Sequence, residues 1–426
     1  MLRDIKADLA IIGDGVAALA LAYLAAQRDI RTVMLGKNFH GTTHSATGLI
    51  APRPDYLLAD EELVRRTAFE CLRWIRLFYP QILSPQRFLI PIGPELPYSV
   101  RTFRTLLSRY DEIAKIRSTG LGSHYIINQA NLEKMEPNLR KSDIDGAISF
   151  GEWTVDPSIL LKKLGWETSV YPDLVKKFHI SDFREFKIRN GMIEEIRALD
   201  AGHKAINISN NRGPLVVVNA TGPWMKDVCA RLGVVMEYQL KAGVQIEVPG
   251  YFFQSGIVTF DSDGKYLVCL QKKGILQVGP TNTDFSGHPD NFIPSDRETE
   301  YLTAALRNIL GDKRLSPYSF LKHGFRIKPT AIDTNRPVIW NHGNAGLHNL
   351  YSLHPGKMAL ALLAGDEMLD RAISDGWLSK PRVVVTNRLY LDGNRKWFNE
   401  AKLLLLKIWA LFKMGLFYLK FISKTP

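Results

Sequence analysis

The sequence predicts an α/β protein with a parallel-sheet domain, an antiparallel-sheet domain and a C-terminal amphipathic helix. At the N-terminus, residues 8–26 run as an apolar strand, a glycine turn and a helix. Two further buried strands, at residues 215–220 and 350–353, extend this unit across the chain, and successive strands with turns fill residues 238–279. Parallel strands joined by helices can share one sheet although they are distant in sequence, whereas strands joined by tight turns pair antiparallel. With 426 residues the chain is long enough for two domains.

The N-terminal segment is typical of a dinucleotide-binding turn. A GxGxxA pattern follows the strand at residues 8–12 and opens the helix, and a second strand at 31–35 closes the βαβ unit. The N-terminus of a helix offers unpaired N–H groups and the positive end of the dipole to a pyrophosphate. The first glycine permits the turn, the second lets the backbone approach the phosphates, and the small third residue packs helix on strand. We therefore expect the dinucleotide at Gly13, Gly15, Val16, Ala17 and Ala18; a purely structural glycine turn is the alternative.

One diagnostic residue of such sites is missing. An acidic residue that binds the ribose usually ends the second strand, but Gly36 and Lys37 follow Leu35 in this chain. We expect ribose binding to be arranged differently, through Lys37, Asn38 or backbone groups.

The elements between these blocks follow from hydrophobic periodicity and turn residues. Residues 38–58 read as a polar loop, and residues 60–79 as a helix with an apolar stripe. Short strands and turns are expected around residues 90–93. Further helices are expected at residues 101–117, 129–135, 158–166, 295–309 and from Gly356 to Leu369, and further strands at 239–248, 257–260, 266–270, 275–278 and 317–328.

Composition narrows the function classes. Hydrophobic residues make up 46% of the chain and charged residues 23%, as in ordinary globular proteins. Cys71, Cys229 and Cys269 are widely separated, so we expect neither a disulfide framework nor a metal site, and the first strand begins too early for a signal peptide. The net charge is +12, yet no nucleic-acid-binding motif is present.

A block of the basic residues lies at the C-terminus. Lys402, Lys413, Lys420 and Lys424 fall on one side of a helix whose remaining surface is rich in Leu, Ile, Phe and Trp. The lysines interrupt any apolar run of about 18–20 residues, so a spanning helix is not expected. A basic amphipathic helix lying in an anionic membrane surface fits the pattern, and a helix docked on the protein or on a second subunit is the alternative.

Four blocks of the chain together resemble a known family. They are Asn219–Trp224, which reads NATGPW; Gly41–Ile50; Gly324–Pro329 with the following Asp333 and Pro337-Val338-Ile339; and Leu353–Met358. In their order and spacing over residues 8–370 they resemble the D-amino-acid-oxidase-like superfamily of FAD oxidoreductases, and within it the FAD-dependent glycerol-3-phosphate dehydrogenases. The chain departs from that branch where Ala51–Tyr56 replace its two-glycine turn, and we expect no room for its longer C-terminal helical domain.

The resemblance implies FAD as cofactor and a set of residues that bind it. The loop after the second strand would contact the flavin phosphates and ring, the NATGPW block would place the end of a strand at the cofactor, and the last turn would direct backbone N–H groups at the flavin pyrimidine edge. Besides the glycine turn, the cofactor residues are therefore Lys37, Thr42, Thr43, His44, Ser45, Ala220, Thr221, Gly222, Trp224, Pro355, Gly356, Lys357 and Met358. The FAD-binding domain then comprises residues 1–85, 142–225 and 337–375, the substrate domain residues 86–141 and 226–336, and the membrane-interface helix residues 396–426.

Three residues are candidates for the chemistry. Arg326 can hold a carboxylate or phosphate with two parallel hydrogen bonds, and Arg53 can supply a second positive contact. His354 can accept the alcohol proton as a neutral imidazole. His44 is a weaker catalytic candidate and a possible covalent flavin attachment, and Lys357 can hold negative charge near the flavin. Each of these side chains can instead be structural or solvated.

These features together predict a dehydrogenase at the cytoplasmic face of a membrane, bound peripherally or as a monotopic protein. It would oxidise glycerol 3-phosphate or a related small anionic alcohol by hydride transfer to flavin and pass the electrons to a membrane quinone. An FAD-dependent amine or amino-acid oxidase is the first alternative. A membrane-associated binding protein without redox activity is the second alternative. The sequence does not decide whether the protein forms a homo-oligomer.

Overall fold

The computed structural model describes residues 3–37, 41–57, 60–94, 96–114, 119–140, 143–211, 213–260, 266–310, 320–329 and 335–379. All of them belong to the compact unit Met1–Arg382. The predicted membrane-interface helix at residues 396–426 lies outside the described residues. Within the described ranges, no helix combines the length and the apolar character needed to cross a bilayer.

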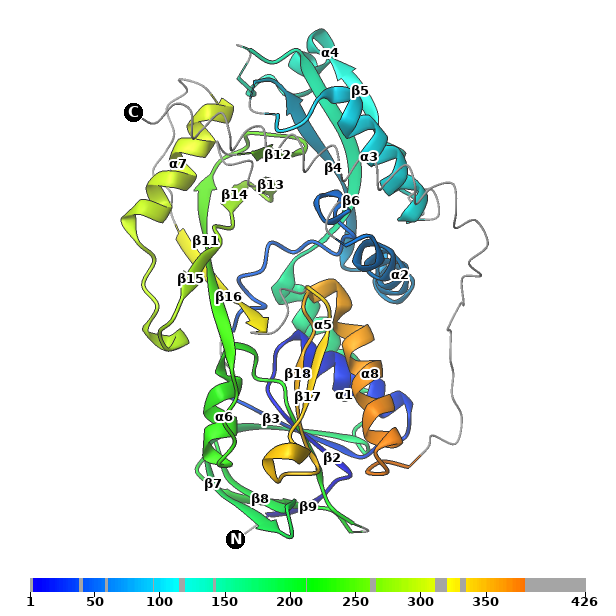
Figure 1. The fold of residues 1–426 in the computed structure, drawn as a ribbon, viewed down its shortest axis with the longest axis vertical. Coiled ribbons are helices and arrows are strands. Elements are labelled where there is room, and N and C mark those ends of the chain that lie inside the picture. Colours follow the sequence, from blue (N-terminus) through cyan, green and yellow to red (C-terminus); the bar gives the residue numbers. More distant parts are fainter. Residues whose placement is uncertain are drawn as a thin grey trace. The chain divides into compact units, whose positions relative to one another are not determined.

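The first sheet contains the predicted parallel strands (Figure 1). Its order is β1 (Arg3–Lys6), β9 (Ala205–Ser209), β8 (Met192–Asp200), β7 (Val175–Arg189), β3 (Thr32–Gly36), β2 (Leu9–Ile12), β10 (Val216–Asn219), β18 (Leu350–His354) and β17 (Val338–Asn341). The strands from β7 to β18 are all parallel, and β17 closes the edge antiparallel. The prediction that three distant segments form one parallel sheet is confirmed.

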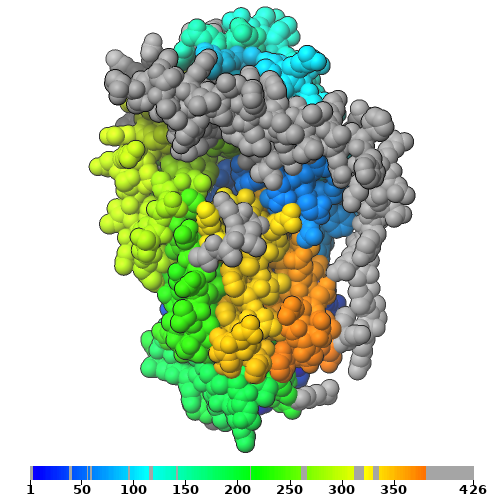
Figure 2. Space-filling view, in the orientation of Figure 1, coloured from blue at the N-terminus to red at the C-terminus, as the bar shows by residue number. Residues whose placement is uncertain are grey.

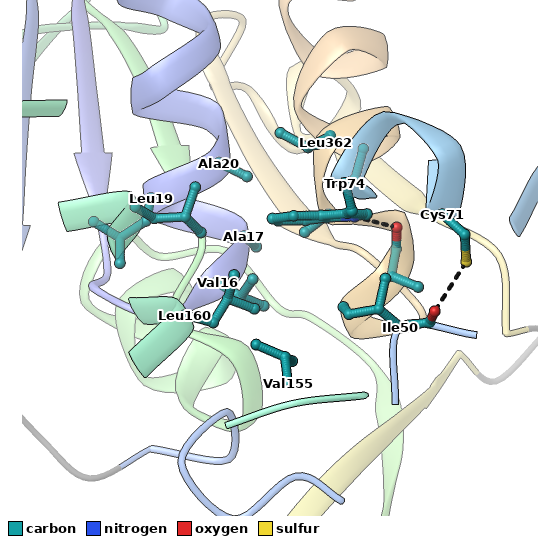
Figure 3. Close-up of a cluster of buried hydrophobic side chains, with 14 of the residues drawn as sticks. Val16, Ala17, Leu19, Ala20, Ile50, Cys71, Trp74, Val155, Leu160 and Leu362 are labelled. Carbon is teal, nitrogen blue, oxygen red and sulfur yellow. Dashed lines mark hydrogen bonds between the residues drawn. The ribbon is translucent and has the colours of Figure 1, made fainter. Parts of the chain in front are cut away.

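Side chains of the central strands alternate between two cores, as the period of two in a strand requires. Leu9 and Ile11 of β2 pack with the helices, whereas Ala10 and Ile12 pack with residues of β8 and β9. The helical layer consists of α1 (Val16–Gln27), α5 (Pro157–Ser169) and α8 (Ala361–Ser374). Figure 3 shows α1 side chains meeting Leu160 of α5 and Leu362 of α8. In Figure 2, α8 (orange) lies beside β17 and β18 (amber).

Small residues bring α1 and α8 close together. Ala17, Ala18, Ala20 and Ala22 of α1 are almost fully buried. A Cβ atom on Gly365 of α8 would stand 2.8 Å from Cδ1 of Leu24 and 3.3 Å from Cα of Leu21. This close packing fixes the N-terminus of α1 relative to the sheet.

The second sheet is mostly antiparallel, as predicted for residues 238–279. Its order is β15 (Thr283–Phe285), β11 (Tyr238–Pro249), β14 (Ile275–Gly279), β13 (Tyr266–Lys272), β12 (Gly256–Phe260), β4 (Leu83–Ile92), β6 (Gly146–Val155) and β5 (Tyr125–Asn128). Strand β16 (Phe320–Pro329) also pairs with β11, and the pair β12–β4 is parallel. The remaining α-helices are α2 (Glu61–Phe78), α3 (Val100–Ile113), α4 (Gln129–Met135), α6 (Met225–Arg231) and α7 (Asp296–Leu310).

Several expectations need correction. Strand β6 belongs to the second sheet, although the predicted division placed residues 142–225 with the FAD-binding domain. The strand expected around residues 90–93 is the end of the ten-residue β4. Pro85 and Pro91 suggest turns in this segment. Strand β4 nevertheless pairs with β6 along its whole length, and its other edge pairs with β12 at Phe88 and Leu89, so neither proline lies where β12 pairs.

Two helix boundaries also differ from the prediction. The last helix begins at Ala361, not near Gly356, because Gly356 has φ +70° and Lys357 is extended. Helix α3 ends at Ile113, and residues 115–117 of its predicted extent lie outside the described residues. The strands β7, β8 and β9 were not expected at all.

Candidate functional site

A cavity of about 590 Å³ lies at the carboxyl ends of β2, β10 and β18. Open α/β sheets bind ligands at this edge, and the volume falls within the range of about 300–1,000 Å³ that small-molecule sites usually have. The cavity is lined by most of the predicted residues: Gly13, Gly15, Val16, Ala17, Lys37, Thr42, Thr43, Ala220, Thr221, Gly222, Trp224, Arg326, His354, Pro355, Gly356, Lys357 and Met358. Ala18, His44, Ser45 and Arg53 are not among its lining residues.

The β2–α1 turn is open to an anion. Gly13 has φ +132° and donates its N–H to the Leu35 carbonyl at 2.9 Å, which fixes the turn on β3. Gly15 is the N-cap residue of α1 and has no side chain that could cap the helix, and the Val16 N–H that follows donates to the Thr43 hydroxyl. Amides at the N-terminus of a helix bind phosphate groups. Ala18 is fully buried, as expected for the small residue that packs the helix against the sheet. Its predicted contact with the cofactor has no counterpart in the cavity lining.

The loop over residues 41–46 joins this turn to β16. The Thr43 hydroxyl accepts a hydrogen bond from the Val16 N–H at 3.3 Å, and the Thr42 hydroxyl accepts one from the Phe325 N–H at 3.3 Å. His44 Nδ1 lies 3.1 Å from the Ser158 hydroxyl of α5. His44 and Ser45 therefore belong to the loop that supports the cavity, and their predicted contact with the cofactor has no counterpart in the lining.

The NATGPW block is shaped by its asparagine. The buried Asn219 side chain donates to the Met225 carbonyl at 2.9 Å and accepts from the Thr221 hydroxyl at 2.7 Å. Gly222 follows with φ +61°. The Trp224 indole then donates to Asp290 at 2.8 Å. These bonds hold the end of β10 in a turn that faces the cavity.

The last turn depends on Gly356. Its φ is +70°, and a Cβ atom there would overlap the carbonyl oxygens of Asn335 and Arg336. The Lys357 ammonium lies over the Tyr56 ring, 4.0 Å from its centroid. Lys357 thus reaches both the cavity lining and an aromatic ring of the short helix η1 (Pro54–Tyr56).

Arg53 lies elsewhere than the sequence suggests. Its guanidinium carbon is 5.0 Å from the Tyr56 ring centroid and 4.8 Å from that of Tyr266. The backbone at Arg53 has φ +66°. A guanidinium stacked between two rings is held by cation–π contacts. Its predicted role as a second contact for the substrate anion therefore finds no support in the cavity lining.

Arg326 and His354 come together from different elements. Arg326 lies on β16 and His354 ends β18, and both line the cavity. Burial, together with the nearby positive charge of Arg326, lowers the pKa of His354 to about 4. Its Nε2 atom is buried and has no hydrogen-bond partner among the described residues. The imidazole is therefore neutral near pH 7 and has a nitrogen available to a bound molecule.

The cavity also has lining residues that the sequence analysis missed. They are Ile12, Asp14, Leu35, Gly41, Ala46, Ile180, Phe183, Pro223, Asp227, Val228, Arg231, Asp290, Phe325, Ile327 and Leu353. Ile180 and Phe183 reach the cavity because β7 pairs with β3, a pairing that no local pattern reveals. Asp14 lies inside the GxGxxA pattern, between its first two glycines, at a position where the pattern allows any residue.

The fold and the site define a class: a two-sheet α/β protein with a dinucleotide site at the carboxyl edge of its parallel sheet. The model of the family DAO, described as FAD dependent oxidoreductase, matches residues 8–371. The chain therefore belongs to this family, and the family's cofactor is FAD.

One curated relative and two solved structures are similar to this chain. An aerobic glycerol-3-phosphate dehydrogenase from Staphylococcus saprophyticus is 22% identical over 79% of this chain, which spans only 60% of that relative's length. The structure of a glycerol-3-phosphate dehydrogenase from Bacillus halodurans complexed with FAD has a TM-score of 0.67 at 19% identity, covering 89% of this chain and 66% of its own. An L-proline dehydrogenase from P. horikoshii has a TM-score of 0.64 at 18% identity, covering 88% and 95% of the two chains. The two structures establish the fold.

The described residues fit FAD. The α1 N-terminus, which begins at the N-cap glycine Gly15, suits the pyrophosphate, and the close approach of the chain at Gly13 leaves no room for a side chain. Polar and charged side chains also line the cavity, among them Thr42, Thr43 and Lys357, and they suit the polar parts of the cofactor. Within the described ranges, no three His, Cys, Asp or Glu residues are grouped in a way that could hold a metal ion.

Proposed function

We propose that this chain is a dehydrogenase that oxidises a small anionic alcohol, with glycerol 3-phosphate as the first candidate substrate. The observation that carries the proposal is the pairing of a cation, Arg326, with a neutral buried imidazole, His354, in the cavity that the dinucleotide turn also lines. A cation suits the anionic group of the substrate, and a neutral imidazole suits its hydroxyl.

The two side chains have separate tasks. The guanidinium of Arg326 binds the phosphate or carboxylate with up to two parallel N–H donors and so orients the alcohol carbon. His354 Nε2 receives the hydroxyl proton in the tautomer that carries its own proton on Nδ1. Since the pKa of His354 is about 4, the imidazole is neutral when the substrate arrives near pH 7 and has one nitrogen able to accept. FAD, when bound, supplies the acceptor of the hydride.

The first experiment is an anaerobic visible spectrum of the purified full chain before and after addition of glycerol 3-phosphate. The expected result is loss of the oxidised flavin band. Bleaching by glycine or L-proline but by no alcohol would replace this proposal with amine oxidation. A flavin that stays oxidised with phospho-alcohols, hydroxy acids and amines alike would overturn the redox proposal and favour a binding protein.

We further propose that residues 396–426 bind an anionic membrane surface at the cytoplasmic face and that a membrane quinone is the electron acceptor. The positions of Lys402, Lys413, Lys420 and Lys424, which would share one side of a helix among apolar residues, support this placement. Flotation of the full chain with vesicles that contain 30% anionic lipid tests it. Loss of flotation on changing the four lysines to glutamate is expected, and flotation unaffected by that change contradicts the proposal.

The acceptor needs its own measurement. A short-chain quinone in detergent should reoxidise the substrate-reduced protein faster than air-saturated buffer does. Faster reoxidation by oxygen would identify an oxidase and remove the reason for a membrane position.

A further inference from the structure

The side chain of Asp14, in the glycine turn, lies against Gly36 at the end of β3. Gly36 ends β3 and is buried, at the position where dinucleotide-binding folds usually carry the acidic residue that binds the ribose. A Cβ atom on Gly36 would stand 2.7 Å from both Cβ and Oδ2 of Asp14, and 3.0 Å from its Cγ. Real Cβ atoms do not make such contacts, so the Asp14 side chain occupies the space that a side chain at residue 36 would need.

Space, not backbone conformation, therefore accounts for the glycine. Gly36 is not among the described residues with positive φ, so its backbone is open to any residue. Gly13, by contrast, has φ +132° and needs glycine for its conformation. The three atoms nearest to a Cβ at residue 36 all belong to the side chain of Asp14.

Asp14 also lines the cavity. It is half-buried and stands between Gly13 and Gly15, where the backbone approaches the pyrophosphate. A carboxylate aimed at a pyrophosphate would be repelled. The contact with Gly36 shows that the Asp14 carboxylate instead turns toward the end of β3, where Leu35 and Lys37 continue the cavity wall.

We propose that Asp14 replaces the absent acidic side chain of residue 36 and accepts hydrogen bonds from the ribose hydroxyls of the adenosine half of FAD. The carboxylate reaches the same wall of the site from the glycine turn instead of from the strand end. Asp14 would then bind the ribose, a role that the sequence analysis expected of Lys37, Asn38 or backbone groups. It rests on FAD as the cofactor and not on the proposed substrate, so either can fail alone.

The test uses protein stripped of FAD and titrated with FAD, followed by flavin fluorescence. Asp14→Ala should weaken FAD binding by about 10- to 100-fold, as expected for loss of a hydrogen bond to a charged group. The exposed aspartate Asp173, outside the cavity lining, provides the control variant Asp173→Ala, which should bind FAD as the parent does. Equal FAD affinity of Asp14→Ala and the parent would overturn the proposal.

A second readout separates ribose recognition from a structural effect on the turn. ADP and its 2′-deoxy and 3′-deoxy analogues compete with FAD for the stripped protein, and the parent should prefer ADP over at least one analogue. Asp14→Ala should lose that preference. A variant that weakens all three competitors equally, and so keeps the preference, would show that Asp14 only shapes the turn.

The exchange can also be reversed. Gly36→Glu alone should bind FAD poorly because the new side chain meets Asp14. The double variant Asp14→Gly/Gly36→Glu removes that obstacle, including the Asp14 Cβ atom that alanine would retain, and should recover both FAD affinity and the preference for ADP over the deoxy analogue. A double variant no better than Gly36→Glu would contradict an exchange between the two positions, provided that thermal unfolding shows it to be folded.

Discussion

Gly13 lies directly against Ala220. A Cβ atom on Gly13 would stand 2.5 Å from the Ala220 carbonyl oxygen, and the Ala220 N–H donates to the Ile12 carbonyl at 2.8 Å. The dinucleotide turn and the NATGPW block, more than 200 residues apart in sequence, are thus in backbone contact. Each turn holds the other at the edge of the cavity.

Gly13→Ala should therefore lose FAD and stability together. The substitution places a Cβ against a carbonyl and forces a positive φ on alanine, and a cost of about 2 kcal/mol or more is expected. The flavin-to-protein absorbance ratio and the thermal midpoint measure both effects. Gly122→Ala is the matched control, since a Cβ at Gly122 meets nothing within 4 Å. A Gly13→Ala protein with full flavin content and an unchanged midpoint would contradict this account.

His354→Asn should slow reduction of the flavin by the substrate. Removal of a positioned proton acceptor typically costs about 10²- to 10⁴-fold in rate. Stopped-flow absorbance gives the rate constant, and the flavin content should stay unchanged. His348→Asn, at an exposed position outside the cavity lining, should reduce at the parental rate.

The pH dependence of that rate follows from the lowered pKa of His354. Since this pKa lies near 4, the imidazole is neutral throughout the neutral range, and the rate should fall only as pH drops through about 4 to 5. The same shift makes folding less favourable in acid: stability is present above the unfolded pKa near 6.5 and is lost as pH falls toward 4. A rate that already halves near pH 6.5 would mean that His354 is not buried as described.

Arg326→Gln should separate binding from chemistry. Loss of a charge-assisted bidentate contact is expected to raise KM for an anionic substrate by about 10- to 100-fold. Turnover of neutral glycerol, however slow, should change much less. Because Arg326 helps to lower the pKa of His354, the acid limb of the pH profile should also move to higher pH. Lys328→Gln, on the same strand but outside the cavity lining, is the control, and equal effects of the two variants would contradict the role of Arg326.

Glu70→Gln should stabilise the protein at neutral and alkaline pH. Burial raises the pKa of Glu70 from 4.5 to about 7, and its Oε2 has no hydrogen-bond partner among the described residues. Because the folded pKa lies above the unfolded one, the folded state loses stability as pH rises from 4.5 to 7, by up to roughly 3 kcal/mol. Arg73 loses its ion pair with Glu70 Oε2, at 3.7 Å, but its shorter ion pair with Asp366, at 2.6 Å, does not involve the changed residue.

Urea unfolding of the Glu70 variant at pH 5 and pH 8 tests this prediction. The gain should be clear at pH 8 and nearly absent at pH 5. Glu62→Gln, at a residue whose side chain is 49% exposed on the same helix, should show no such pH dependence. A gain equal at both pH values would contradict a raised pKa.

The sequence was informative where function depends on the backbone of a short segment. The turns at Gly13, Gly222 and Gly356 need conformations that glycine adopts easily, so their residues could be recognised from local pattern. The strands β2, β3, β10 and β18 could also be predicted from the sequence. Both faces of a central parallel strand are buried, so each appears as a continuous apolar run. The family, the cofactor and most of the cavity lining follow from these segments.

Only the tertiary structure decided which side chains meet. No sequence spacing reveals that β6 joins the second sheet, that Arg53 is stacked between Tyr56 and Tyr266, or that Arg326 lies near enough to His354 to lower its pKa. The absent acid at residue 36 was visible in the sequence, but its relation to Asp14 was not. Backbone preferences act between neighbours in the chain, whereas packing and charge act through space, and the distance between Asp14 and Gly36 is set by the pairing of β2 with β3.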